Sequence, residues 1–134
     1  MRICIVTSAP LPPREGIGFH VWNLAVHLCR KGHSVGVVTR GWAQPTVEEW
    51  RQGIPIWRVP FAPVYPFHVQ IHAPFVNALL RDKAEDFDLV NAHTPLAPPI
   101  RSPLPLVVTV HSPMAADTAA SRVHDLRSLL LHLQ

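Results

Sequence analysis

Residues 2–40 read RICIVTSAPLPPREGIGFHVWNLAVHLCRKGHSVGVVTR, and this stretch decides the fold. Residues 3–7 are a short, continuously apolar run, which is typical of a strand buried on both faces of a parallel sheet. A proline-rich loop follows, then a helical pattern from about Gly18, and then a second apolar run over residues 35–39. This order predicts a strand–helix–strand unit with a right-handed crossover.

The helical pattern has one apolar face and clear end signals. Arg30 and Lys31 would lie in the last turn, where cations favour the helix dipole, and Gly32 can adopt the left-handed conformation that ends a helix. Asn23 and His27 fall on the polar face. The apolar face is formed by Ile17, Val21, Leu24, Ala25, Leu28 and Cys29.

The rest of the chain continues the alternation of strands and helices. Strands are predicted over residues 54–59, 88–92 and 106–110, and a helix over residues 74–83, opened by Pro74. Residues 60–73 are expected to be an irregular loop. A last helix would carry Val123, Leu126, Leu130 and Leu133. The predicted fold class is α/β: a Rossmann-like, doubly wound parallel sheet of about five strands with flanking helices.

Composition excludes several classes of protein. The chain has 134 residues, a net charge of +3 and only 16% charged residues, which excludes a disordered polyelectrolyte and disfavours a nucleic-acid surface. No apolar run reaches the roughly 18–20 residues of a membrane span. Prolines from Pro10 onward interrupt any signal-peptide core. Two cysteines in apolar stretches suggest buried thiols, and hence a cytoplasmic protein.

The final helical pattern runs to Gln134 without a capping residue or a closing strand. Its leucines need a surface against which to pack. We therefore expect either a fragment of a longer protein or a homo-oligomer formed through this helix; the alternative is that the helix folds back onto the sheet.

Two kinds of candidate site residue follow the predicted strands. Gly16 and Gly18 open the first helix, where backbone N–H groups favour an anion such as a diphosphate. Val21 stands where a dinucleotide fingerprint needs its third small residue, and no P-loop sequence is present, so a nicotinamide enzyme is disfavoured. The alternative is an ordinary glycine-bearing turn.

Histidines follow two of the predicted strands. His93 and Thr94 end the strand at residues 88–92, and His111 and Ser112 follow the strand at residues 106–110. Ligands bind beyond the carboxyl ends of parallel strands, and an imidazole can exchange a proton near neutral pH. The alternative is that these histidines only form hydrogen bonds within loops.

The remaining polar candidates are weaker. His20 and the other histidines are interpreted as surface or capping residues, and a metal site at His68 and His72 is disfavoured because Pro74 argues against a helix there. Asp86 and Asp88 are interpreted as part of a solvated turn at the amino end of a strand.

Together these motifs resemble the N-terminal domain of the family 4 retaining glycosyltransferases of the GT-B fold. The resemblance covers nearly the whole chain in the family's order. It is carried by the motifs at residues 1–7, 12–13, 16–21, 24–28, 31–35, 38–40, 53–60, 86–93 and 107–112.

The resemblance implies a role for each candidate residue. Gly16, Ile17 and Gly18 would face the diphosphate of a nucleotide-sugar donor. His111 would be the catalytic residue, contacting the transferred sugar and handling the acceptor proton. His93, Thr94 and Ser112 would line the acceptor side. No metal or other cofactor would be needed. The loop at Gly16 and the imidazole of His111 should therefore meet at one edge of the sheet.

The family's C-terminal, donor-binding domain is absent from residues 1–134. The chain therefore corresponds to a single, incomplete acceptor-side domain, and we expect it to be inactive alone. The acceptor would be a glycan, a lipid or a small molecule; aromatic residues within 60–75 could form a membrane-facing edge, although core packing also explains them. The alternative functions are a non-catalytic interaction or regulatory module of the same fold, and an unrelated nucleotide-binding protein.

Overall fold

The computed structural model describes residues 1–42 and 44–112. The predicted last helix, with Val123, Leu126, Leu130 and Leu133, lies outside the described residues, and so does the expectation of self-association through it.

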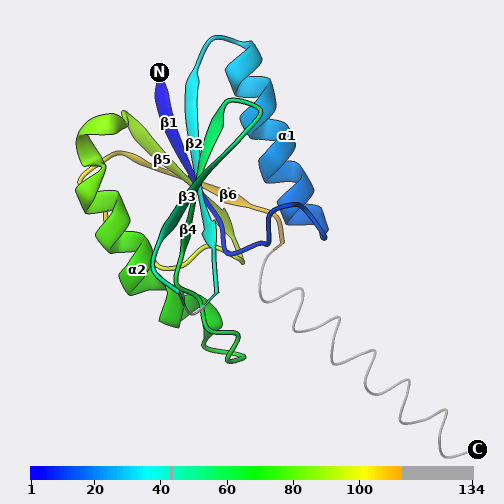
Figure 1. Cartoon of the computed structure of the whole chain (residues 1–134), viewed down its shortest axis with the longest axis vertical. Helices are drawn as coiled ribbons and strands as arrows, with labels where there is room; N and C mark the ends of the chain where they lie inside the picture. Colours follow the sequence, from blue (N-terminus) through cyan, green and yellow to red (C-terminus); the bar gives the residue numbers. More distant parts are fainter. Residues whose placement is uncertain (43, 113–134) are drawn as a thin grey trace, which may run out of the picture.

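A mixed, mostly parallel sheet of six strands forms the centre of the fold, with strand order β3-β4-β2-β1-β5-β6. Helices α1 and α2 lie on opposite faces of this sheet (Figure 1). The predicted Rossmann-like α/β class is therefore confirmed. The elements are β1 (Arg2–Val6), α1 (Gly16–Arg30), β2 (Ser34–Arg40), β3 (Val47–Arg51), β4 (Ile54–Val59), α2 (His68–Asp82), the short 3-10 helix η1 (Ala84–Asp86), β5 (Leu89–Thr94) and β6 (Leu106–Val110).

The core has two layers because successive side chains of a strand point to opposite faces. Ile3 and Ile5 of β1 pack with Val21 and Ala25 of α1, which confirms the apolar face predicted for this helix. Their neighbours Cys4 and Val6 pack on the other side, in the cluster that includes Val76 and Leu80 of α2. Burial on both faces explains why the strand sequences are continuously apolar.

One strand, β3, was not predicted. It pairs antiparallel with β4, with Arg51 opposite Ile54, so that Gln52 and Gly53 form a two-residue hairpin turn. Both turn residues have positive φ, 51° and 74°, as a type I′ turn requires. The strand VEEWR has no buried residue, and therefore lacks the apolar pattern that would have revealed it.

The predicted boundary of the second helix is also wrong. α2 begins at His68 rather than at Pro74, and the proline lies inside it. The missing N–H of Pro74 removes one backbone hydrogen bond. Val69 and His72 precede Pro74 and are buried, so packing holds this first half of the helix in place.

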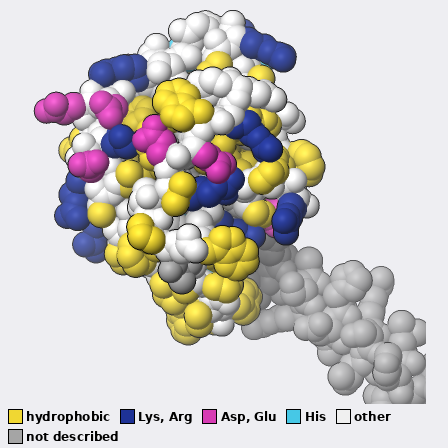
Figure 2. Space-filling view, viewed as in Figure 1, with side chains coloured by type: hydrophobic (Ala, Val, Ile, Leu, Met, Phe, Trp, Pro, Cys, Tyr) yellow, Lys and Arg dark blue, Asp and Glu magenta, His cyan; other side chains and the backbone are white. Residues whose placement is uncertain are grey.

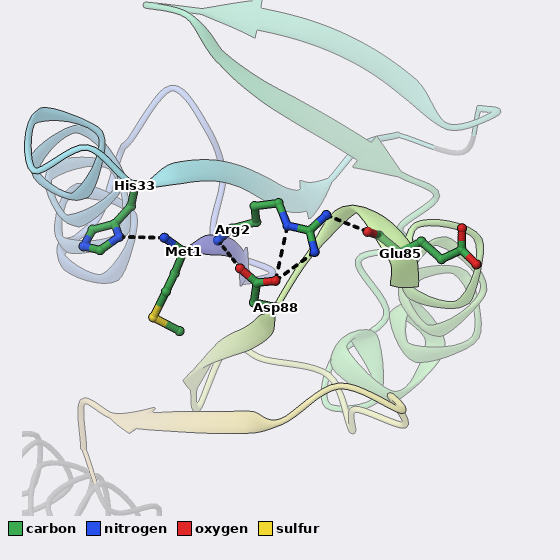
Figure 3. Close-up of polar contacts among 5 residues, drawn as sticks. All are labelled: Met1, Arg2, His33, Glu85 and Asp88. Atoms are coloured by element: carbon green, nitrogen blue, oxygen red, sulfur yellow. Dashed lines mark hydrogen bonds and ion pairs between the residues drawn. The ribbon is translucent and has the colours of Figure 1, made fainter.

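At the amino ends of the strands, Asp88 forms hydrogen bonds with Arg2, whereas the sequence predicted only a solvated turn there. Figure 3 shows the Arg2 guanidinium donating to Asp88 Oδ1, at 2.8 Å from Nη2, and to the Glu85 carbonyl oxygen, at 2.8 Å from Nη1. The backbone N–H of Arg2 donates to Asp88 Oδ2 at 2.7 Å. The hydrogen bond from Arg2 lowers the pKa of the Asp88 carboxyl group. These contacts tie the start of β1 to the segment leading into β5.

Gly36, in the middle of β2, lies under an indole ring. A Cβ atom at this position would lie 2.4 Å from Trp57 Cζ3 and 3.0 Å from Phe87 Cζ. The Trp57 ring is held by a hydrogen bond from its Nε1–H to Glu48 Oε2, 3.0 Å away, and by an edge contact with Phe87. Glycine is needed here for close approach rather than for its backbone conformation.

Among the described residues, strand β6 forms one edge of the sheet and pairs with β5. Its side chains Leu106, Val107, Val108 and Val110 are exposed. Hydrophobic side chains also gather at the lower end of the molecule in Figure 2, where the loop between β4 and α2 lies in Figure 1. Within the described part of the chain, no helix has the length and apolar character needed to cross a membrane.

Candidate functional site

Three histidine side chains meet near the carboxyl ends of β5 and β6. His93 lies in β5, His111 directly follows β6, and His20 lies in the second turn of α1. His93 Nδ1 lies 2.9 Å from His111 Nε2. The His20 ring centroid lies 4.8 Å from that of His111 and 5.5 Å from that of His93. We call these three residues the histidine cluster.

The protonation of the cluster follows from Asn91, also in β5. Asn91 Nδ2 donates to the Val107 carbonyl oxygen, which can only accept, and to Thr109 Oγ1, at 3.2 and 3.0 Å. Asn91 Oδ1 therefore faces His93 Nε2, 2.7 Å away, and accepts its proton. A neutral His93 then has its lone pair on Nδ1, where it accepts from the Nε2–H of His111. This leaves Nδ1 of a neutral His111 as a hydrogen-bond acceptor.

The surroundings favour neutral imidazoles. His93 is fully buried, and burial, together with His111 and His20, lowers its pKa to about 4. Desolvation, and then the nearby His20, also lower the pKa of His111. The rings of His93 and His111 are therefore uncharged near neutral pH. A neutral imidazole has a nitrogen lone pair that can accept a hydrogen bond from a hydroxyl group.

The predicted glycine loop lies beside this cluster. Gly16, Ile17 and Gly18 form the first turn of α1, two residues before His20. A Cβ on Gly18 would lie 3.2 Å from the Pro10 carbonyl oxygen, whereas a Cβ on Gly16 would meet nothing within 4 Å. The contact between His20 and His111 thus brings the beginning of α1 and the end of β6 together, as expected.

Thr94 and Ser112 line a groove on the α2 side of the same strand ends. The groove has a volume of about 910 Å³, and much of its wall is apolar, from Val69 of α2 to Val108 and Val110 of β6. Thr94 Oγ1 donates to the Thr109 carbonyl oxygen at 3.3 Å. Of the predicted site residues, His93 and His111 therefore touch each other, whereas Thr94 and Ser112 belong to this neighbouring groove.

A second, smaller pocket contains three arginines that were not predicted as site residues. It has a volume of about 270 Å³ and is lined by Arg14, Arg40, Arg58 and the exposed Trp42. Arg58 pairs with Glu49 at 2.5 Å, and the Arg40 guanidinium lies over the Phe61 ring at 5.1 Å. These arginines come from separate segments of the sequence, so no single sequence motif could have predicted the pocket.

His72 is a buried histidine outside the cluster. It lies in α2, and its Nδ1 is 2.7 Å from Ser8 Oγ, just beyond β1. Burial, and then the charge of Arg40, lower the pKa of His72 to about 4.

We expect His72 to make the fold sensitive to mild acid. Because its pKa of about 4 is below the ordinary value of 6.5, the unfolded chain binds more protons between these values, and stability falls as pH decreases through that range. His72→Gln should reduce the loss of unfolding free energy between pH 7 and pH 5 by about 2 kcal/mol. Urea denaturation at both pH values measures this difference.

The buried His93 contributes in the same direction, so the His72→Gln variant should keep part of the pH dependence. Substituting the exposed His27 with glutamine provides the matched control. An unchanged pH dependence in His72→Gln would show that this ring is not held neutral by the fold.

Comparison with known proteins identifies the family. A model of the family described as Glycosyltransferase Family 4 matches residues 14–133. The chain belongs to glycosyltransferase family 4. None of the curated protein sequences compared with the chain matches it.

A solved structure shares the fold of this family 4 chain. Sucrose-phosphate synthase from Thermosynechococcus elongatus is 16% identical to it, with a TM-score of 0.59. The match covers 83% of the chain and 33% of the synthase, so the family 4 chain spans about a third of the length of that protein. At this identity the likeness supports the fold alone.

His20 is the residue of the histidine cluster that the sequence did not reveal. It was interpreted as a surface or capping residue, and it is indeed exposed, but its ring packs against two other imidazoles. The one available signal was its position two residues after Gly18, at the helix end expected to face a ligand.

Proposed function

We propose that this family 4 chain is the acceptor-side domain of a retaining glycosyltransferase that uses a nucleotide-sugar donor. A donor-binding C-terminal domain would complete the cleft. The acceptor would be a glycan, a lipid or a small molecule. Family membership supports the reaction class, and the contact between α1 and His111 is the observation that supports the position of the site.

In the proposed reaction, the bond between the anomeric carbon and the diphosphate oxygen breaks. A new bond forms from that carbon to the acceptor oxygen, and the proton of the acceptor hydroxyl would pass to Nδ1 of His111 and from there to the departing diphosphate or to water. His111 would accept a hydrogen bond from a sugar or acceptor hydroxyl through Nδ1, since its Nε2–H is donated to His93. His93 would position His111 and line the acceptor side.

The leaving diphosphate would face the first turn of α1. Gly16, Ile17 and Gly18 lie there, and the first turn contains no acidic side chain. Free N–H groups and the positive end of the helix dipole offset negative charge at this position. We therefore propose that the transfer step itself needs no metal ion.

The groove beside Thr94 and Ser112 would receive the acceptor. Because the groove and the histidine cluster lie on opposite faces of β5 and β6, the acceptor would reach His111 around the ends of these strands. Its apolar wall and the nearby exposed side chains of Tyr65 and Phe67 suit an acceptor with an apolar part, including a lipid met by peripheral membrane contact. Two free cysteines support a reducing, cytoplasmic location for the reaction.

The test is complementation by a donor-binding domain. We expect the 134-residue chain alone to release no nucleoside diphosphate from a panel of UDP-, GDP- and ADP-linked hexoses, because half a cleft cannot orient the reactants. Joining it to a family 4 donor-binding domain should give release that requires both parts. Failure of every donor in the joined protein, with both parts folded, would favour a non-catalytic interaction or regulatory module instead.

A further inference from the structure

The histidine cluster has the composition and geometry of a metal site. His20, His93 and His111 each offer a ring nitrogen, and these three atoms lie within 4.8 Å of one another. In a tetrahedral zinc site with three imidazole ligands, Zn–N bonds of about 2.0–2.1 Å place the nitrogens roughly 3.3 Å apart. The distance from His93 Nδ1 to His111 Nε2 is 2.9 Å, and no two of the three ligand atoms are more than 4.8 Å apart, so the expected spacing lies within the observed range.

The three ligands come from separate elements that the fold holds in different ways. His93 is buried in β5, so its ring is fixed by packing, and His111 is half-buried beyond β6. His20 is exposed on α1, so its side chain can adjust to complete the coordination. Because His20 is exposed and His111 is half-buried, solvent reaches the cluster on this side, and water could supply a fourth ligand.

Asn91 orients His93, the most buried of the three ligands. Asn91 Oδ1 accepts the Nε2 proton of His93, and Asn91 is itself held through Nδ2 by Val107 and Thr109. The lone pair of His93 Nδ1 is thereby directed into the cluster. Such outer hydrogen bonds typically fix the tautomer and ring orientation of a metal-binding histidine.

We propose that His20, His93 and His111 bind a divalent transition-metal ion of the kind that imidazole prefers, with Zn²⁺ as the probe. Binding replaces the hydrogen bond between His93 and His111 with two metal–nitrogen bonds, and His111 carries its remaining proton on Nδ1. Three neutral nitrogen ligands with one open position are typical of zinc sites that also bind an exchangeable water. The metal site does not depend on the proposed sugar transfer, and the two exclude each other at His111: with an ion on Nε2, Nδ1 carries the proton and cannot accept one from an acceptor hydroxyl.

The test is titration of the metal-free 134-residue chain with Zn²⁺ by calorimetry at pH 7.5, together with the visible absorption spectrum of the Co²⁺ form. We expect one ion per chain and the intense bands of tetrahedral Co²⁺. His20→Asn and His111→Asn should each weaken binding at least ~10-fold. Asn91→Ala, which removes the amide that accepts the Nε2 proton of His93, should do the same. His20 is exposed, so His20→Asn tests the site without disturbing the core.

The controls address the other groups that bind zinc. His27→Asn changes an exposed histidine on the same helix, His33→Asn removes the ring beside the N-terminal amine, and Cys29→Ser removes a free thiol. These three variants should bind Zn²⁺ as the original chain does. The proposal is overturned if His20→Asn and His111→Asn bind as tightly as the original chain, or if binding disappears in a control variant.

Discussion

Replacing Gly36 with alanine is expected to destabilise the fold by about 3 kcal/mol, at the upper end of the usual cost of overpacking. The added methyl group would lie 2.4 Å from Trp57 Cζ3, which is far inside van der Waals contact. The indole cannot move away freely, because Glu48 accepts its Nε1–H and Phe87 packs against it edge-on. Urea denaturation followed by circular dichroism measures the change.

Gly16→Ala is the matched control for this prediction. It adds the same methyl group to another glycine, but into open space in the first turn of α1. We expect its unfolding free energy to differ from that of the original chain by less than about 1 kcal/mol. Equal stability of Gly36→Ala and Gly16→Ala would contradict the packing described around Trp57.

A double variant tests the cause. If the clash with the indole is responsible, Gly36→Ala combined with Trp57→Leu should be less destabilised than the sum of the two single variants, by at least about 1 kcal/mol. Additive effects would instead place the cost of Gly36→Ala in the backbone of β2.

The second large effect concerns His111. In the protein completed by a donor-binding domain, His111→Asn should lower the turnover number for sugar transfer by roughly 10²–10⁴-fold, the range associated with loss of a proton-transfer group. The asparagine retains hydrogen-bonding capacity but cannot exchange a proton near neutral pH. The release of nucleoside diphosphate with a saturating acceptor measures the change.

The control again uses the helix beside the cluster. His27→Asn should leave transfer unchanged, since His27 is exposed on α1 away from the ring contacts of His20. Donor affinity should also survive in His111→Asn if the other domain supplies most of the donor contacts. Turnover within about threefold of the original protein would exclude His111 from the proposed role.

Prediction from sequence succeeded where burial imposed a pattern. The strands β1, β2, β4 and β5 and the apolar face of α1 were predicted because each covers, or is covered by, another element. Strand β6 was predicted from the same kind of apolar run, although most of its side chains are exposed in the described part of the chain. Gly32 ends the helix pattern with a φ of 87°, as its position beyond Arg30 and Lys31 predicted. These features leave a local periodic or conformational signature in the sequence.

The errors occurred where local signals were missing or misleading. β3 is a surface hairpin strand without a buried side chain, and Pro74 indicated a helix start although Val69 and His72 continue the buried face before it. His20 joins the cluster through tertiary contacts between α1 and two strand ends far away in the chain. The two strand-end histidines could be predicted because topology alone brings them to one edge of the sheet.

The position of His111 beside β6 affects the local stability of the proposed site. Its neighbour β6 is an edge strand with half-exposed side chains, whereas His93 belongs to the better-supported interior of the sheet. Local opening costs least at such margins and need not involve the rest of the domain. The distance between the imidazoles of His93 and His111 therefore depends on how stably β6 is held in the sheet. Any contact that stabilises β6 would also stabilise the proposed site.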